Sequence, residues 1–468
     1  MDIKKNDVLT ATVKALGFNG EGIIDHFGTT VFVPFSLAGE KIDFKVLKVK
    51  GNVAFGKVEK VISPSISRLT PVCPVFFKCG GCQLQHLEYS KQLDFKAETV
   101  KNCFKKIAGL DVDIDKKFAS PNVYAYRNKL QLPTRALKSG NAVGFFRPNS
   151  HDVVKTDVCP IHPEWANKVI SAVNEFIEKS GVSLYDEVSG KGVLRHVVVR
   201  EINGEYLFTF VINAKTLKNT DLLTDILKRD FGKFSLYLNE NTSDSNVILG
   251  ERFELCFGKG YITVTEFGVT YDITPQAFYQ VNTPVKTEIY NDVLSFVSSG
   301  GDTAVIDGYA GAGVLTAMLA KKCAKSVGVE IVKEACDSAV KLAADNRIDN
   351  MEFICGDCEK VLPELIEKVR KTYGRVVLVL DPPRKGVDVK TLTAALKNPP
   401  DEIIYISCSP QTLARDVGVL TGSLKYENNQ LINLSKDFSP NYDLKFVGIY
   451  DMFAQTKHVE TVVRLSRQ

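Results

Sequence analysis

A cysteine and a carboxylate each follow a hydrophobic run near the end of the chain. Cys408 comes directly after residues 404–407, and Asp381 closes the run 376–381. Open α/β sheets bind ligands at the carboxyl ends of their strands, so we expect both side chains to lie at one crevice. By residue type alone, Cys408 would more often be a small buried hydrophobic residue. Its position at a strand end favours a nucleophilic thiol instead.

A glycine-rich turn and further acidic strand ends precede these two residues. Residues 308–313 (Gly-Tyr-Ala-Gly-Ala-Gly) follow the run that ends at Asp307, and glycine lets a backbone approach a ligand closely. Glu330 ends the next run, where a carboxylate can accept hydrogen bonds from both hydroxyls of a ribose. Asp357 ends the third run, where the edge of an adenine could lie. Together they favour S-adenosylmethionine, and a different nucleotide remains the alternative.

Four cysteines form a second group of candidate ligands. Cys73, Cys79 and Cys82 lie within ten residues, and Cys159 is a distant fourth. The chain starts without the apolar core of a secretion signal, which argues against a disulfide framework. The spacing alone permits zinc, an iron–sulfur cluster or plain core packing.

The first 62 residues have the pattern of a small β-structure. Ile42, Phe44 and Val46 alternate with polar residues, which is the period of a half-buried strand. With glycine turns between short strands, this length predicts a five-stranded barrel of the oligonucleotide-binding type. Its lysines suit a polyanion, although a solvated barrel edge carries the same pattern. These lysines are Lys41, Lys45, Lys48, Lys50, Lys57 and Lys60.

Two further units follow the barrel. Residues 63–270 include an expected helix over 86–107, with Leu93, Val100 and Phe104 on one face, and then mainly strands. Residues 271–468 alternate strand-like and helix-like runs, which predicts a parallel, doubly wound sheet. The strand-like runs are residues 304–307, 326–330, 351–355, 376–381 and 402–407.

Motifs in this last unit resemble those of the uracil-5 RNA methyltransferases. They are residues 276–282, Asp-Pro-Pro-Arg at 381–384, Ser-Cys-Ser-Pro at 407–410 and the tail 451–461. The resemblance implies an α/β protein: an N-terminal OB-like TRAM barrel, a β-rich central domain with an iron–sulfur site, and a C-terminal Rossmann-like methyltransferase domain. It also implies that helix 86–107 packs on the methyltransferase domain.

The same resemblance assigns roles to individual residues. Cys408 is expected to be the nucleophile and Glu460 the base. Gln280, Tyr309, Glu330 and Asp381 are expected to bind the S-adenosylmethionine, with Asp357 on its adenine side. The chain has Ala310 where relatives commonly have cysteine, and Gly308 where they have a larger residue, which bears on packing around the cofactor and not on the chemistry.

The chemistry explains why such residues are needed. Carbon 5 of uracil is a poor nucleophile, but addition of a thiolate to carbon 6 turns the ring into an enolate. Carbon 5 can then attack a sulfonium methyl, after which a base must remove the carbon-5 proton so that the cysteine can leave.

The cysteines and the barrel indicate which class of RNA is the expected substrate. The three-plus-one arrangement of Cys73, Cys79, Cys82 and Cys159 resembles the [4Fe-4S] site of the ribosomal-RNA branch of the family. This implies 23S ribosomal RNA as the substrate. The alternatives are a transfer-RNA uracil-54 enzyme, whose smaller members generally lack barrel and cysteines, and an inactive iron–sulfur protein that binds RNA or senses redox state.

Composition limits the compartment and the partners. No apolar run is long enough to span a bilayer, and a cytoplasmic location is expected. The net charge of +4 is weak evidence for a polyanionic partner. No obligate protein partner is evident, so a monomer that binds 23S ribosomal RNA and no membrane is expected.

Overall fold

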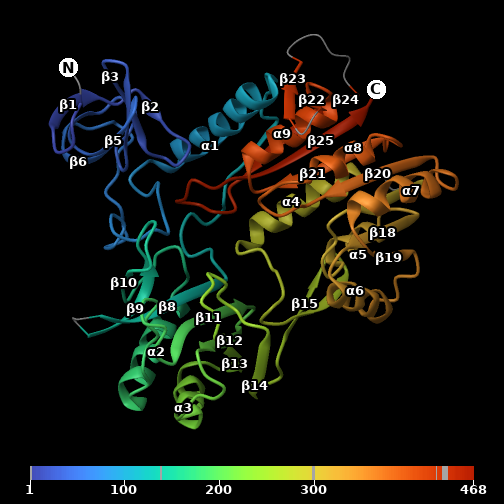
Figure 1. Cartoon of the computed structure of the whole chain (residues 1–468). Helices are drawn as coiled ribbons and strands as arrows, with labels where there is room; N and C mark the ends of the chain where they lie inside the picture. The colour runs from blue at the N-terminus through green and yellow to red at the C-terminus, as the bar shows by residue number, and fades with distance from the viewer. Residues whose placement is uncertain (1–2, 138–139, 298–300, 428–429, 435–440) are drawn as a thin grey trace.

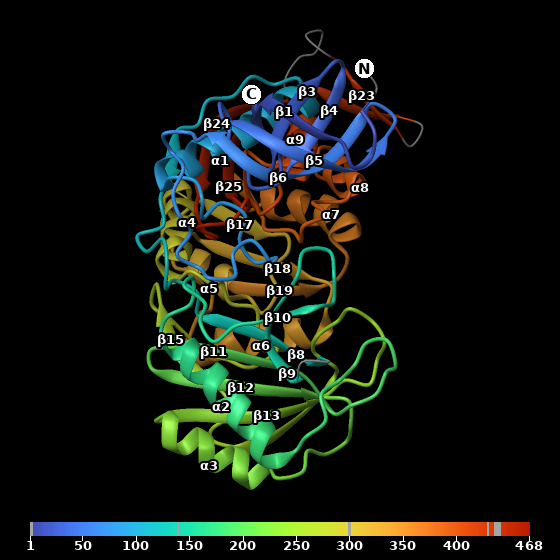
Figure 2. The same cartoon turned by 90° about the vertical axis from the view of Figure 1, so that its left-hand side faces the viewer.

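The computed structural model describes residues 3–137, 140–297, 301–427, 430–434 and 441–468. A small N-terminal sheet and a central sheet lie at opposite ends of the molecule, with a larger C-terminal sheet beside both (Figures 1 and 2). In this described part, no helix is both long and apolar enough to cross a membrane.

The N-terminal sheet has the strand order β1-β5-β6-β4-β3-β2. Ile24, Val31, Ile42 and Phe44 are fully buried in its core, as the alternating pattern predicted. The two end members of this sheet are neighbours in the chain: only Val13 and Lys14 separate β1, which pairs with β5, from β2, which pairs with β3. Counted as one bent strand, β1 and β2 give the five strands that the sequence predicted, and closure of the barrel stays a prediction. The strands are β1 (Val8–Thr12), β2 (Ala15–Leu16), β3 (Gly22–His26), β4 (Thr29–Val33), β5 (Lys41–Lys50) and β6 (Val53–Ser63).

A cysteine-bearing loop leads from this sheet to helix α1 (Tyr89–Cys103), which continues as the π-helical turn η1 (Phe104–Ala108). Val100 and Phe104 are fully buried and pack against α9 (Pro410–Thr421) of the C-terminal unit. The turn ends at Gly109, whose φ of 69° is in the left-handed region that glycine tolerates. Helix α1 is thus part of the C-terminal hydrophobic core although it lies far from it in sequence.

The central sheet has the order β10-β9-β8-β11-β12-β13-β14. Two amphipathic helices, α2 (Trp165–Ser180) and α3 (Thr220–Asp230), bury Phe176 and Leu227 against it. The strands are β8 (Lys129–Leu137), β9 (Gly140–Phe146), β10 (Val153–Lys155), β11 (Leu194–Ile202), β12 (Glu205–Ile212), β13 (Lys233–Glu240) and β14 (Arg252–Phe257). The hairpin of β15 (Ile262–Glu266) and β16 (Val269–Ile273) then leads to the C-terminal unit.

The C-terminal sheet has the order β19-β18-β17-β20-β21-β25-β24-β7. Its first five strands are parallel, as the alternating runs predicted. Antiparallel β25 and β24 extend it, and β7, from the segment after α1, adds an edge strand that the sequence did not indicate. The strands are β7 (Lys116–Phe118), β17 (Thr303–Asp307), β18 (Lys325–Glu330), β19 (Met351–Cys355), β20 (Arg375–Leu380), β21 (Glu402–Ser407), β24 (Tyr442–Tyr450) and β25 (Glu460–Arg467).

Helices cover both faces of this sheet. Ile306 points into a core shared with α1, α7, α8 and α9, and its neighbour Val305 points into a core shared with α4 and α5. Burial on both faces explains why the strands read as continuous hydrophobic runs. The remaining elements are α4 (Thr283–Phe296), α5 (Val314–Ala320), α6 (Lys333–Asp345), α7 (Cys358–Arg370), α8 (Val389–Ala395), β22 (Leu424–Glu427) and β23 (Gln430–Asn433).

Candidate active site

The carboxyl edge of the parallel strands gathers the candidate residues. In the sheet order from β19 to β21, the residues that end or follow the strands are Asp357, Glu330, Asp307, Asp381 and Cys408. Because parallel strands share one carboxyl edge, these side chains form a row along one side of the sheet. Asp381 and Cys408 follow neighbouring strands, but Asp381 does not line the cavity at Cys408, so a shared crevice stays a prediction.

The register of the neighbouring antiparallel pair adds Glu460 to this edge. Strand β21 pairs with β25, and Ser407 lies opposite Thr461. Continuing that register by one residue places Cys408 opposite Glu460. Cys408, after the end of β21, thus faces Glu460, at the start of β25, although 51 residues lie between them in the chain.

Burial and like charge dominate the electrostatics of this group. Burial, and next the negative charge of Asp381, raise the pKa of Glu460 to about 8. Burial and the charge of Asp307 raise the pKa of Asp381 to about 7. Burial, and next the charge of Glu460, raise the pKa of the Cys408 thiol, while Arg384 opposes both effects. Arg384 therefore favours the deprotonated forms of the thiol and of Glu460.

A cavity of about 130 Å³ opens onto Cys408. Its polar lining includes Arg384, Gln411 and His458. Burial, and next the charge of Arg384, lower the pKa of His458 to about 4, so its ring is neutral at physiological pH. The cavity thus offers neutral and cationic hydrogen-bonding groups beside the thiol. The other lining residues are Phe18, Thr99, Ser409, Pro410, Lys457 and Val459.

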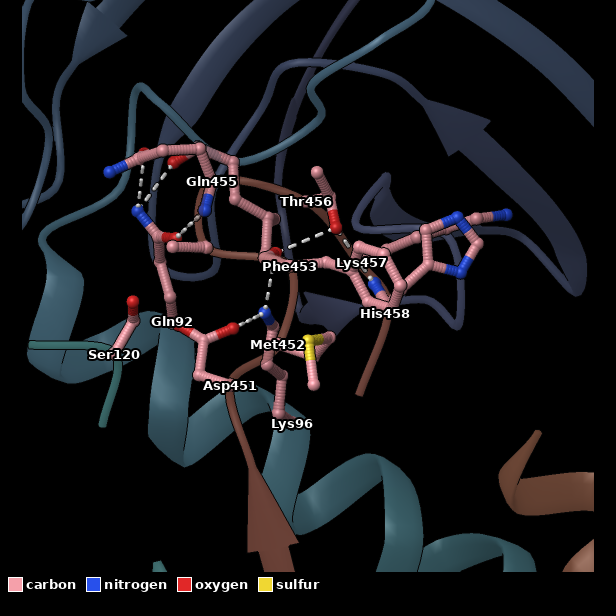
Figure 3. Close-up of polar contacts among 12 residues, drawn as sticks. Gln92, Lys96, Ser120, Asp451, Met452, Phe453, Gln455, Thr456, Lys457 and His458 are labelled. Atoms are coloured by element: carbon pink, nitrogen blue, oxygen red, sulfur yellow. Dashed lines mark hydrogen bonds and ion pairs between the residues drawn. The ribbon is translucent and has the colours of Figure 1, made fainter. Parts of the chain in front are cut away.

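The segment 451–459, which leads into Glu460, is anchored by α1 (Figure 3). Lys96 Nζ donates to Asp451 Oδ1 at 2.5 Å and to the carbonyl oxygen of Phe453 at 3.1 Å. The side chains of Lys96 and Asp451 are both fully buried. Asp451 Oδ2 also accepts from Tyr89 Oη at 2.6 Å. The start of this segment is therefore fixed by a buried ion pair.

A second anchor holds the middle of the segment. Gln92 Nε2 donates to Gln455 Oε1 at 3.0 Å, and the backbone N–H of Gln455 lies 3.2 Å from Gln92 Oε1. The carbonyl oxygen of Gln455 accepts from the backbone N–H groups of Gln83 and Leu84 at 3.1 and 3.0 Å. Gln455 has a φ of 70°, a left-handed conformation that needs such support in a residue other than glycine.

Sequence reasoning missed these anchors. Lys96 follows Leu93 by three positions and precedes Val100 by four, so it lies on the helix face expected to be apolar. A charged residue on a buried face is rarely left unpaired. That position was the available signal, although it could not identify Asp451 as the partner.

The glycine-rich turn and its carboxylates lie at the other end of the row. Glu330 accepts from the backbone N–H groups of Gly311 at 3.0 Å and Val332 at 2.9 Å. Asp357 caps α7 and accepts from the backbone N–H of Glu359 at 3.0 Å. Asp307, not among the expected cofactor residues, has a buried Oδ1 without a hydrogen-bond partner, and burial raises its pKa to about 6.

The two remaining cofactor candidates lie on different segments. Tyr309 is partly buried and packs against the core beneath the turn. Gln280 is also partly buried, and its backbone carbonyl oxygen accepts from Asn128 Nδ2 at 2.9 Å. Asn128 immediately precedes β8, so the central unit supports the segment that carries Gln280.

The four predicted ligand cysteines line one cavity of about 160 Å³. Burial raises the pKa of Cys82 and of Cys159 to about 12 each, and the other cysteines of the group add to both shifts. Arg127 and Lys129 line the same cavity, and Arg127 Nε is buried without a hydrogen-bond partner. Among the described residues, no three His, Cys, Asp or Glu side chains are arranged to hold a single metal ion. The cavity thus brings four thiols and two cationic side chains together.

Comparison with known proteins adds independent information. A family model described as tRNA (uracil-5-)-methyltransferase matches residues 88–468, and a TRAM domain model matches residues 4–58. An uncharacterized RNA methyltransferase of Clostridium tetani is 39% identical over 468 residues, which cover 99% of this chain and 97% of that protein. Another, of Clostridium acetobutylicum, is 37% identical and covers 99% and 98%, respectively.

A solved structure is similar to this chain over nearly its whole length. It is Pyrococcus abyssi tRNA (uracil-54, C5)-methyltransferase in complex with S-adenosyl-L-homocysteine. The TM-score is 0.75 at 27% sequence identity, and the match covers 97% of this chain and 99% of that chain.

Proposed function

The chain belongs to the tRNA (uracil-5-)-methyltransferase family, and from this premise we propose that it methylates carbon 5 of a uracil in RNA through a covalent bond to Cys408. The observation that carries the proposal is the register of β21 and β25, which sets Cys408 opposite Glu460 at the ligand-binding edge of the sheet. A thiol and a carboxyl group at one edge are the two groups that this chemistry requires.

The roles of the residues follow from the order of the bonds. The Cys408 thiolate adds to carbon 6 of the uracil, and the electron pair of the 5,6 double bond becomes available at carbon 5. S-adenosylmethionine supplies the electrophilic methyl group. Glu460 then removes the carbon-5 proton, the double bond re-forms and the Cys408 sulfur leaves. A pKa of about 8 suits Glu460 as a base, because a base works best when its pKa is near the operating pH.

Two features support S-adenosylmethionine binding at the carboxyl edge. The Pyrococcus abyssi structure holds S-adenosyl-L-homocysteine. In this chain Glu330 stands beside the glycine-rich turn, where it would accept from the ribose hydroxyls, and Asp357 would lie at the adenine. Gln280, Tyr309 and Asp381 are proposed to complete the site. Asp307 would support the turn, because its Oδ2 accepts from Thr316 Oγ1 at 2.7 Å and so joins the end of β17 to α5.

A [4Fe-4S] cluster is proposed for the cavity lined by Cys73, Cys79, Cys82 and Cys159. A cluster with four thiolate ligands is anionic, and Arg127 and Lys129 would offset that charge. Zinc is the alternative occupant, because four cysteines can also bind a single zinc ion. Protein purified without oxygen should contain about four irons and four sulfides per chain. Stoichiometric zinc without labile sulfide would refute the assignment.

For the substrate we propose 23S ribosomal RNA. The cysteine arrangement resembles that of the ribosomal-RNA branch, and exposed lysines on β5 and β6, such as Lys48, Lys50 and Lys57, suit RNA phosphates. Transfer RNA is the second candidate, because the Pyrococcus abyssi tRNA enzyme matches 97% of this chain, which weakens the argument that transfer-RNA enzymes are smaller. An inactive RNA-binding or redox-sensing protein is disfavoured, since Cys408, Asp381 and Glu460 are all present.

One experiment separates these substrates. 5-Methyluridine would be mapped in ribosomal and transfer RNA from cells with the gene, without it, and with a Cys408→Ala copy. We expect one or more sites in 23S ribosomal RNA to disappear without the gene and not to be restored by the Cys408→Ala copy. Disappearance confined to transfer RNA would select the second candidate, and no change in either RNA would refute the proposed function.

A further inference from the structure

We propose that Phe18, on the N-terminal sheet, forms the aromatic wall of the reaction pocket and stacks on the nucleotide that is methylated. This inference rests on the proposed function and deepens it. It gives the TRAM domain a role inside the reaction pocket, in addition to any grip on RNA phosphates at its surface.

The cavity that opens onto Cys408 is built by two units of the chain. Cys408, Arg384 and His458 come from the C-terminal unit, and Phe18 comes from the turn between β2 and β3. The side chain of Phe18 is 40% exposed, so part of its ring is free to contact a guest. An aromatic face with polar groups opposite it is the arrangement that binds an unstacked nucleobase.

The turn that carries Phe18 is held in a defined shape. The backbone N–H of Gly17 donates to the carbonyl oxygen of Glu21 at 2.7 Å, and that of Gly20 donates to the carbonyl oxygen of Gly17 at 2.9 Å. Gly20 has a φ of 81°, and a Cβ atom there would lie 2.8 Å from Leu84 Cδ2. The turn therefore packs closely on residue 84, whose backbone N–H in turn donates to the carbonyl oxygen of Gln455.

Lys457 ties the same turn to the segment that leads to Glu460. Its ammonium group donates to Asn19 Oδ1 and lies 5.9 Å from the centroid of the Phe18 ring. Its backbone N–H donates to Gln83 Oε1 at 3.4 Å. Lys457 projects from the same segment as Asp451 and Gln455 (Figure 3). Contacts on both sides of the turn thus hold Phe18 in place relative to Cys408 and to the segment that leads to Glu460.

This geometry gives Phe18 a specific task. A base that has left its stack no longer touches the neighbouring bases, and an aromatic ring in the pocket replaces part of that stacking. The contribution of one such aromatic ring corresponds to an affinity change of about 5- to 140-fold. The effect should fall on RNA binding and on formation of the Cys408 adduct, because Phe18 lies on the unit that carries no expected S-adenosylmethionine ligand.

Phe27 provides the matched control. It lies at the turn between β3 and β4 of the same sheet, it is 82% exposed, and it does not line the cavity at Cys408. Phe18→Ala and Phe27→Ala remove the same side chain from one unit, so a general weakening of RNA binding would affect both. Phe18→Tyr keeps an aromatic face, and Phe18→Leu keeps an apolar side chain without one.

The test measures methylation of unmodified 23S ribosomal RNA and unmodified transfer RNA by the full-length variants. It also measures trapping on RNA that contains 5-fluorouracil. We expect Phe18→Ala and Phe18→Leu to raise the KM for RNA by about 5- to 140-fold and to slow trapping, with unchanged S-adenosylmethionine affinity. Phe18→Tyr should remain near wild type and Phe27→Ala within about twofold.

Two results for the variants would overturn the inference. One is a Phe18→Ala KM equal to that of Phe27→Ala. The other is full activity of Phe18→Leu, which would show that an apolar side chain without an aromatic face suffices. If the wild-type protein methylated no uracil in either RNA, the proposed function would fail and this inference with it. An active wild type with an unaffected Phe18→Ala variant would refute only the role of Phe18.

Discussion

Replacement of Lys96 by methionine should destabilise the C-terminal unit strongly. Lys96 and Asp451 are both fully buried, and the substitution leaves the carboxylate without its cation. Removing one partner of a buried ion pair costs about 3–5 kcal/mol. Tyr89 Oη still donates to Asp451, which favours the lower end of that range, while the carbonyl oxygen of Phe453 is left without this donor. For a unit of about 150–250 residues, the destabilisation corresponds to a fall in Tm of roughly 6–20 °C.

The assay is thermal unfolding followed by circular dichroism, with two comparison variants. Lys91→Met removes a lysine from the same helix whose ion pair with Asp94 is 53% exposed on both sides, so it should cost under about 1 kcal/mol. Lys96→Met combined with Asp451→Asn removes both buried charges, keeps an acceptor for Tyr89 and should recover most of the stability. Equal Tm values for Lys96→Met and Lys91→Met would refute the reasoning.

Further predictions concern pH and salt. Methylation should rise as the pH passes about 8, where Glu460 loses its proton, and should continue to rise at higher pH, because burial raises the pKa of the Cys408 thiol above its ordinary value. Arg384→Met should move the rise to higher pH, since Arg384 lowers both pKa values, and an unmoved pH–rate profile would contradict this. Glu460 has a folded pKa of about 8 against an ordinary 4.5, so its contribution to the free energy of unfolding should fall as pH rises from about 4.5 to about 8. Glu460→Gln should remove that slope, as measured by denaturant titration at several pH values. Lys48 and Lys50 are exposed on β5, and their replacement by alanine should make the affinity for RNA less dependent on salt. The slope of log affinity against log salt concentration should become shallower by about 0.7–0.9 for each RNA phosphate that these lysines neutralise. An unchanged slope would show that these lysines of β5 do not bind RNA.

The parts of the site that follow from strand ends were predictable from sequence. Asp381 and Cys408 end buried hydrophobic runs, and parallel strands necessarily present such residues at one edge. Glu460 was different, because it starts a strand that enters the sheet antiparallel, and only the family resemblance pointed to it. No local pattern in residues 451–461 predicts that the strand beginning at Glu460 pairs with β21.

The parts that depend on distant contacts were not predictable. The pair of Lys96 with Asp451 and the approach of Phe18 to Cys408 join segments far apart in the chain. A period-2 pattern identifies a strand and its buried face but not the strand's partners, so the order of the six strands could not be read from it. Likewise, the pairing of β7 with β24 rests on three residues and leaves no periodicity to read.

The central claim is the covalent mechanism, and the state of the RNA on the Glu460→Gln enzyme tests it most directly. Cys408 acts before methyl transfer and Glu460 acts after it, and a neutral amide cannot take the carbon-5 proton. Substrate RNA incubated with Glu460→Gln and S-adenosylmethionine should therefore accumulate as a methylated adduct, seen as a denaturant-resistant band that protease releases. The double variant Cys408→Ala, Glu460→Gln should give no band. Full turnover by Cys408→Ala alone, or a band that persists in the double variant, would contradict the mechanism.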